Sequence, residues 1–371
     1  MKKAIALLAA AVMLVSCSSQ DNSGNVHETD NSEFVSIQKL FDGYDELTGM
    51  EHRTFSLPEK ISLTAPENIY ALEVVPREKA NVESDGQKLF SSIVPEGFSS
   101  GNCRWDENNY FYTYNDEHYT AQFTGAMLTF SSDKKAAGEM NSENLSERFD
   151  AAEDSDKPIM LGIDTISVGE MCSIAEKYLN ERIGFLVPDF EIRVHDIFPY
   201  KAANENRVRI ISALYCEGIP VEEYISPTLE ISNDQIKSYY NCMIDMIMTA
   251  PDECILLNMY SIPKVSSKES KDKIIGIKEA VGLLDSSLAE YTSYSFDDIK
   301  LMYCGLLTQP VIDATNGDYE AARAKTEEFE AIPKRLEPTW CFIIDNKLSG
   351  FSRQIIKLNA LTGEITMDIH N

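Results

Sequence analysis

Apolar side chains recur along this chain with two periods, one typical of amphipathic helices and one typical of half-buried strands. Residues 166–179, ISVGEMCSIAEKYL, and residues 275–288, IGIKEAVGLLDSSL, carry apolar side chains at helical spacing. An alternating segment follows each of them, at residues 189–196 and 298–305. The two copies align without a gap, DFEIRVHD over DIKLMYCG, and their apolar positions coincide. This repeat predicts a unit of one helix packed on an antiparallel sheet.

Residues 34–132 show strand, helix and hairpin patterns in that order. Residues 61–77 alternate as extended chain, and residues 84–94 carry a helical apolar stripe. Residues 109–130 are aromatic and β-rich around a central turn, as in a hairpin. We therefore expect an α+β fold of tandem modules, each with one helix packed on an antiparallel sheet, after a signal peptide and a flexible tether.

Three stretches interrupt these patterns. Residues 133–158 are polar and charged, and we expect a domain boundary there. Residues 235–248 have helical spacing where a strand would extend the neighbouring sheet, so helix and strand both stay open. Residues 313–335 are charged and alanine-rich, which indicates an exposed insertion. The expected segments are a signal peptide (1–16), a flexible tether (17–33), an N-terminal module (34–132), a polar linker (133–160), a middle module (161–230) and a C-terminal module (231–371).

The first residues, MKKAIALLAAAVMLVSC, predict export. Two lysines precede an apolar run that is too short to span a bilayer, which takes ~20 residues. The sequence LVSC at residues 14–17 resembles the lipobox of bacterial lipoproteins. That resemblance implies cleavage between Ser16 and Cys17 and a lipid on Cys17, which would anchor the protein to the outer face of the cell membrane or envelope. The alternative is ordinary signal cleavage beside an unmodified cysteine.

The chain is strongly acidic, with 33 basic and 60 acidic residues and a formal net charge of −27. Such a charge disfavours nucleic acid and anionic lipid as partners. Solubility on an exported surface explains the charge best, and a cationic partner is compatible with it.

Cysteine spacing gives no indication of a metal site. Of the 8 cysteines, those after Cys17 are odd in number, contain no C-x-x-C and lie partly in apolar runs. We expect mostly reduced, buried thiols and neither a metal nor a cofactor. The cysteines concerned are Cys103, Cys172, Cys216, Cys242, Cys254, Cys304 and Cys341.

The stretch GFSSG at residues 97–101 fits the G-x-S-x-G pattern of serine hydrolases, with Ser99 as its central residue. A nucleophile elbow needs a strand before the serine and a helix after it. Here a helical pattern precedes the motif and no helical pattern follows it, so we expect a loop. His195 alternates with Glu191 and Arg193 on the polar face of its strand, which favours a solvated face over a catalytic base. We therefore expect no catalytic residue.

Two further groups of side chains suggest binding, each with a simpler alternative. An acidic cluster offers oxygen ligands for calcium but lacks the ligand order and glycine of an EF-hand loop, so linker solvation accounts for it better. Its members are Asp150, Glu153, Asp154 and Asp156. An aromatic group in the N-terminal module could line a binding surface, although alternate tyrosines on a strand more often cover a core. Its members are Trp105, Tyr110, Tyr112 and Tyr114.

Residues 355–365, IIKLNALTGEI, resemble the last hairpin of a PepSY-type domain, with Asn359 where aspartate is usual. The helical pattern at residues 275–290 and the strand at 298–304 stand in the family's order, so the resemblance covers mainly residues 275–369. It implies a helix on an antiparallel sheet. It also implies an exported protein that binds and restrains a peptidase or a membrane sensor kinase, without catalysis of its own.

Three functions follow, in order of preference. The first is a non-catalytic, lipid-anchored protein that binds or regulates another cell-envelope protein. The second is a lipoprotein that binds a peptide or glycan at an aromatic cleft around Tyr110 and Tyr112. The third is a serine hydrolase that uses Ser99. The first two differ in whether the aromatic side chains converge on an open cleft or lie buried.

Overall fold

The structure is a computed structural model that describes most of residues 34–371, which form one unit. Within that range the description omits residues 49, 60, 62–64, 76–80, 95–96, 108–109, 134–146, 203, 223–229, 233–234, 241–242, 261, 289–292, 311–333, 346–352 and 370–371. The expected signal peptide, the tether and nearly all of the charged insertion lie outside the described residues. No helix in the described part is long and apolar enough to cross a membrane.

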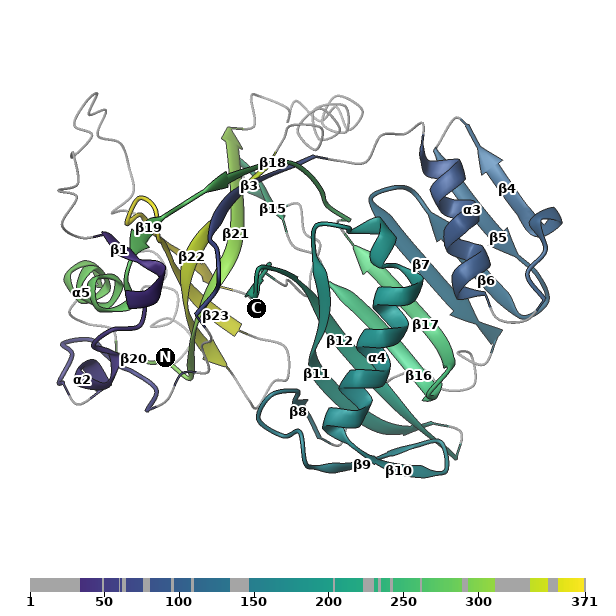
Figure 1. The fold of residues 1–371 in the computed structure, drawn as a ribbon, viewed down its shortest axis with the longest axis horizontal. Coiled ribbons are helices and arrows are strands. Elements are labelled where there is room, and N and C mark those ends of the chain that lie inside the picture. The colour runs from purple at the N-terminus through teal and green to yellow at the C-terminus, as the bar shows by residue number, and fades with distance from the viewer. Residues whose placement is uncertain are drawn as a thin grey trace, which may run out of the picture. The chain divides into compact units, whose positions relative to one another are not determined.

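A ten-stranded antiparallel sheet is the larger of two main sheets (Figure 1). Its path runs β4-β5-β6-β7-β17-β16-β12-β11-β8, with β13 beside β12. Strands β5 to β7 alternate buried side chains with half-buried or exposed ones, because one face lies under helices, whereas β12, β16 and β17 carry runs of buried residues. They are β4 (Cys103–Asp106), β5 (Phe111–Asn115), β6 (Tyr119–Phe123), β7 (Met127–Ser132), β8 (Phe149–Asp150), β11 (Glu191–Ala202), β12 (Glu205–Cys216), β13 (Ile219–Pro220), β16 (Ile244–Ala250) and β17 (Glu253–Tyr260).

Two helices cover one face of this sheet (Figure 1). The helix α3 (Val82–Ile93) buries Leu89 and Phe90 against β5. The helix α4 (Val168–Arg182) begins at a capping box, in which Ser167 and Glu170 satisfy each other's backbone N–H groups. Asn180 then ties α4 to β11, since its side chain accepts from the Ile192 N–H and donates to the Ile192 carbonyl.

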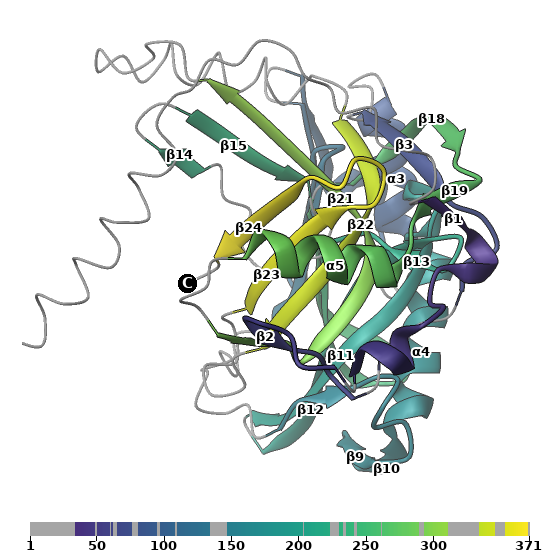
Figure 2. The same ribbon diagram turned by 90° about the vertical axis from the view of Figure 1, so that its left-hand side faces the viewer.

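The second main sheet carries helix α5 (Ile277–Ser287) on one face (Figure 2). Its path is β14-β15-β21-β22-β23-β24, and β3 joins it by pairing with both β22 and β18. Trp340 anchors the core, because its indole N–H is buried and donates to the Ile275 carbonyl at 2.8 Å. The strands are β3 (Tyr70–Val75), β14 (Glu230–Ser232), β15 (Gln235–Tyr240), β18 (Lys264–Ser270), β21 (Asp298–Pro310), β22 (Lys334–Asp345), β23 (Arg353–Asn359) and β24 (Ile365–Ile369).

Short elements complete the described chain. Three two-stranded sheets pair β1 with β19, β2 with β20, and β9 with β10. These strands are β1 (Phe34–Ser36), β2 (Phe55–Ser56), β9 (Pro158–Leu161), β10 (Asp164–Ser167), β19 (Lys273–Ile275) and β20 (Tyr294–Ser295). The short helices are α2 (Tyr44–Thr48) and the 3₁₀ helices η1 (Ile37–Lys39), η3 (Ser100–Asn102) and η6 (Gly184–Leu186).

The expected α+β fold of tandem helix-on-sheet modules is wrong. The described residues are mainly strand in large sheets, with four α-helices among them. Strands from distant parts of the sequence share these sheets: β7 pairs with β17, and β3 pairs with β22. Hydrogen bonding between such distant strands, which the local pattern does not encode, replaces the separate modules with shared sheets.

Residues 235–248, left open between helix and strand, form β15 and β16. Ile247 and Met248 point to opposite faces of β16, yet both are buried. Apolar residues on both faces erase the alternation of a half-buried strand, so the pattern imitates a helix.

Part of the expected polar linker is also structured. Residues 149–150 form β8, which pairs with β11, and residues 158–161 form β9. Phe149 and Ile159 are buried there.

Candidate functional site

A cleft of about 890 Å³ lies between strands of the two main sheets. One wall comes from β11, the turn after β12 and the loop after β8, and the other comes from β21, β22 and β23. On β21 the alternation of the strand buries Ile299 in the main hydrophobic core and turns Asp298 and Lys300 toward the cleft.

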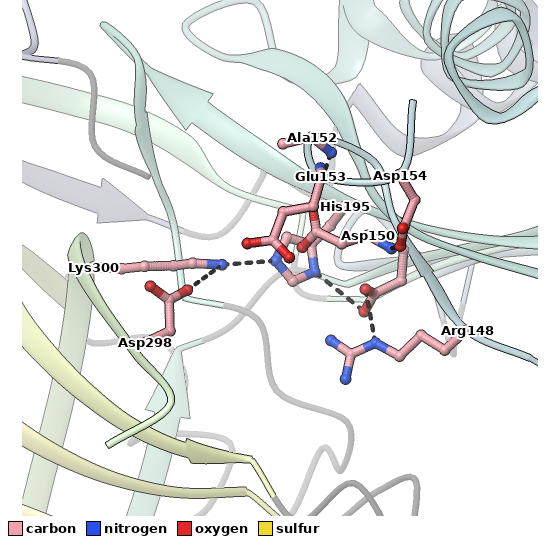
Figure 3. Close-up of polar contacts among 9 residues, drawn as sticks. Arg148, Asp150, Ala152, Glu153, Asp154, His195, Asp298 and Lys300 are labelled. Carbon is pink, nitrogen blue, oxygen red and sulfur yellow. Dashed lines mark hydrogen bonds and ion pairs between the residues drawn. The ribbon is translucent and has the colours of Figure 1, made fainter. Parts of the chain in front are cut away.

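A chain of polar contacts crosses the cleft (Figure 3). The Lys300 ammonium lies 3.1 Å from His195 Nε2 and 3.3 Å from Asp298 Oδ2. His195 Nδ1 lies 3.2 Å from Asp196 Oδ2, and Arg148 Nε donates to Asp196 Oδ1 at 2.9 Å. An ammonium group has donors only, so His195 Nε2 accepts and Nδ1–H donates to Asp196. The arrangement fits a neutral histidine that links a strand of each main sheet.

A β-bulge positions two consecutive residues of this chain. The register of β11 against β12 shifts between Val194 and Asp196. In a regular strand His195 and Asp196 would point to opposite faces, whereas the extra residue of a bulge brings both to one side. Groups outside the pairing of β11 with β12 satisfy backbone groups at the bulge. The Val194 N–H donates to Glu176 of α4 at 3.0 Å, and the Ala151 N–H donates to the His195 carbonyl at 3.0 Å.

Asp196 is a buried carboxylate, with 8% of its side chain exposed. Burial alone would raise its pKa. The hydrogen bond from His195, the positive charge of His195 when it is protonated and the positive charge of Arg148 outweigh burial and hold the pKa of Asp196 well below its usual range. Asp196 is therefore a fixed negative charge that orients His195.

A buried ion pair lies beside the cleft. Lys357 of β23 contacts Glu222, and their side chains are 7% and 5% exposed. The Glu222 N–H donates to the Tyr303 carbonyl at 3.0 Å, which ties this segment to β21. Glu222 also lines the cleft, so its ion pair with Lys357 holds this part of the wall against β23.

Carboxylates dominate the lining of the cleft. The eight acidic residues are Glu67, Asp150, Glu153, Asp189, Glu191, Glu217, Glu222 and Asp298. The permanent cations of the lining are Arg193 and Lys300, each with a carboxylate partner, Glu191 at 2.6 Å and Asp298 at 3.3 Å. Two more lining carboxylates pair with lysines behind the wall, Asp189 with Lys268 at 3.2 Å and Glu222 with Lys357. Four carboxylates remain beyond these pairs. Walls of low dielectric lined by one sign of charge focus the field in the space between them. The cleft is therefore suited to a cation-rich ligand.

The four aromatic residues of the expected binding surface do not come together. Tyr112 and Tyr114 are 5% and 1% exposed and pack under α3 near Phe90. Tyr110 is exposed, and Trp105 meets it edge-on at 6.3 Å between ring centroids. A surface shared by all four is ruled out, because α3 covers the face of β5 that carries Tyr112 and Tyr114.

Ser99 lies in a loop between α3 and η3. The chain thus runs from helix through loop to a 3₁₀ turn and then β4, without the strand-to-helix turn of a nucleophile elbow. Ser16 and Cys17 lie outside the described residues.

The described cysteines are free thiols, buried except for half-buried Cys103. Burial raises the pKa of Cys172 to about 12 and that of Cys216 to about 11. Cys242 lies outside the described residues.

The acidic cluster divides between two roles. Asp150 and Glu153 line the cleft, and the Asp150 side chain accepts the N–H groups of Ala152 and Glu153 at 2.8 and 3.1 Å (Figure 3). Asp154 caps the same turn by accepting the Asp150 N–H at 3.0 Å. The cluster shapes the loop that borders the cleft.

Sequence reasoning did not select His195 and Lys300, which lie 105 residues apart in the chain. One signal was present. The ungapped repeat places Asp189 over Asp298 and Glu191 over Lys300, and all four residues line the cleft. The polar positions at the start of the two repeated strands therefore mark the site.

Comparisons with known proteins show the fold and no more. No protein-family model matches the chain, and no curated protein matches it. A similar solved structure is the crystal structure of an uncharacterized protein from Eubacterium rectale at 1.45 Å resolution. Its TM-score is 0.50 at 12% identity, over 85% of this chain and 90% of that one. At this identity the likeness concerns the arrangement of elements and assigns no function.

Proposed function

We propose that this chain is a non-catalytic, lipid-anchored protein of the cell envelope that binds a cation-rich segment of another envelope protein in the acidic cleft. The observation that carries the proposal is the surplus of carboxylates in the lining: four of the eight are ion-paired with a lysine or arginine, and Glu67, Asp150, Glu153 and Glu217 add negative charge beyond those pairs. Complementary charge guides association and selects among partners.

The volume of the cleft and the fixed spacing of its walls support binding. A volume of about 890 Å³ lies within the usual range for ligand sites, about 300–1,000 Å³. The contacts from Lys300 through His195 to Asp196 fix the spacing of the walls before a ligand arrives. Preorganised walls lower the entropy lost on binding.

The location and the kind of partner rest on the sequence. The resemblance of residues 14–17 to a lipobox supports a lipid anchor on Cys17, and the net charge of −27 supports long-range attraction of a cationic partner. The PepSY-type resemblance falls on β23 and β24, and Ile355 of β23 lines the cleft. That resemblance makes a peptidase or a sensor kinase the expected partner.

Site-specific photo-crosslinking of the intact lipoprotein in living cells tests this proposal. A photoreactive residue replaces Ala152 at the cleft, which leaves every cleft carboxylate in place, and a matched variant carries it at Ile163, which is 93% exposed outside the cleft lining. We expect one envelope protein to be trapped from position 152 but not from position 163, through a peptide rich in lysine or arginine. Equal trapping from both positions, or an acidic contact peptide, would contradict the proposal.

A further inference from the structure

A second hollow, of about 760 Å³, lies on the ten-stranded sheet and shares no lining residue with the cleft. Tyr112 and Tyr114 of β5 point to α3, so the alternating residue Thr113 points to the opposite, open face. The hollow therefore lies on the face of β4 to β7 and β17 that the helices leave uncovered.

A row of polar residues crosses this face from strand to strand. The sheet register pairs each residue with the next across five neighbouring strands. In order the row is Arg104, Thr113, Gln122, Thr129 and Asn258. All five line the hollow, and all except exposed Arg104 are half-buried.

Another row runs beside the first. The register pairs Asn115 with Thr120, Thr120 with Ser131, and Ser131 with Leu256. Thr120 and Ser131 are 2.9 Å apart and exchange a side-chain hydrogen bond. The two rows together present hydroxyl and amide groups, which both donate and accept hydrogen bonds.

The charge of this hollow differs from that of the protein. The chain has 60 acidic residues and a net charge of −27, yet no carboxylate is among the described residues that line the hollow, where Arg104 is the single charged residue. A solvated sheet face in so acidic a chain would be expected to carry carboxylates. The lining thus suits a neutral ligand and disfavours a cationic one.

We infer that this hollow, the polar trough, binds a linear neutral oligosaccharide. Strands in a sheet are about 4.8 Å apart, a step comparable to the length of one hexopyranose unit, so the rows offer a hydrogen-bonding group to each successive sugar. Half-buried Tyr260 lines the same hollow and provides a ring on which a sugar face can stack. Exposed Arg104 can donate hydrogen bonds to sugar hydroxyl groups, so a neutral ligand does not need a negative charge to contact it.

Calorimetric titration of the intact protein with neutral hexasaccharides tests the inference. The probes are cellohexaose, xylohexaose, chitohexaose and maltohexaose. We expect at least one of them to bind, and Gln122→Ala and Asn258→Ala each to weaken that binding about tenfold. The matched control is Gln87→Ala on the exposed face of α3, which should leave the Kd unchanged.

A second variant separates loss of binding from loss of fold. Gln122→Glu preserves the shape of the side chain and adds a charge to the trough, and we expect it also to weaken binding without lowering the thermal unfolding temperature. The inference is overturned if no hexasaccharide binds at millimolar concentration. It is overturned equally if the trough variants bind as the control does, or if a decapeptide competes for the same residues.

Discussion

The buried ion pair of Glu222 and Lys357 offers a quantitative test of how the cleft is built. The side chains are 5% and 7% exposed, so both charges have lost their hydration and depend on each other. Lys357→Met removes the lysine charge and leaves the Glu222 carboxylate buried without its ion-pair partner. Breaking a buried pair in this way costs about 3–5 kcal/mol of folding free energy.

A double variant that removes both charges should recover the lost stability. In the double variant with Glu222→Gln and Lys357→Met no buried charge remains, and replacement of a whole buried pair by neutral groups is often near neutral. We therefore expect the double variant to recover most of the stability that Lys357→Met loses, which corresponds to a coupling of about 3 kcal/mol. The assay is urea denaturation followed by tryptophan fluorescence, with Trp340 reporting on the core.

An exposed pair supplies the control. Lys278 and Glu46 are 62% and 66% exposed at 3.3 Å, and Lys278→Met should change stability by less than about 1 kcal/mol. The reasoning fails if Lys357→Met behaves like Lys278→Met. It fails too if the double variant loses as much stability as the sum of the losses of Lys357→Met and Glu222→Gln, each measured alone.

Three further predictions concern the packing and charge of the described chain. A Cβ on Gly86 of α3 would stand 2.5 Å from the buried Tyr112 ring, so Gly86→Ala should lower the free energy of unfolding by about 1–3 kcal/mol, as urea denaturation would show. The control is Gly282→Ala in α5, which has open space around the added methyl group and should raise the free energy of unfolding by up to about 1 kcal/mol. The depressed pKa of Asp196 means that its contribution to stability is present above an unfolded pKa of about 3.9 and is lost as the pH falls toward the lower folded value. The stability gap between the wild type and Asp196→Asn should therefore shrink from pH 6 to pH 3, and a constant gap would contradict the assignment. Burial raises the pKa of Cys172 to about 12, so iodoacetamide at pH 8 should label it far more slowly in native than in urea-unfolded protein, as mass spectrometry of the peptides would show.

Local patterns predicted the three longer α-helices and several strands. The stripes at residues 84–94, 166–179 and 275–288 correspond to α3, α4 and α5, and the aromatic alternation of residues 109–130 corresponds to β5 and β6 and most of β7. Each signal is contained in its own segment, because one face of the element is buried and the other is not.

The assembly of these elements was not predictable from local pattern. The pairing of β7 with β17 joins residues far apart in the sequence, and the residue pattern of neither strand indicates which strand it pairs with. The aromatic surface failed for a related reason: alternation shows that Tyr112 and Tyr114 share a face, but not that α3 covers it. His195 and Lys300 meet only because a bulge in β11 turns His195 toward a strand of the other main sheet.

Fluorescence anisotropy with labelled decalysine tests the central claim most directly, because it separates the acidic cleft from the net charge of the protein. The cleft variant is Glu153→Gln with Glu217→Gln, and the control is Glu107→Gln with Asp252→Asn, which removes the same charge from exposed positions outside the lining. Each cleft carboxylate near a ligand cation contributes about 1 kcal/mol, so we predict that the cleft variant binds at least about tenfold more weakly while the control changes little. Equal weakening in both variants would show that net charge alone attracts the peptide, and would contradict the cleft as the binding site.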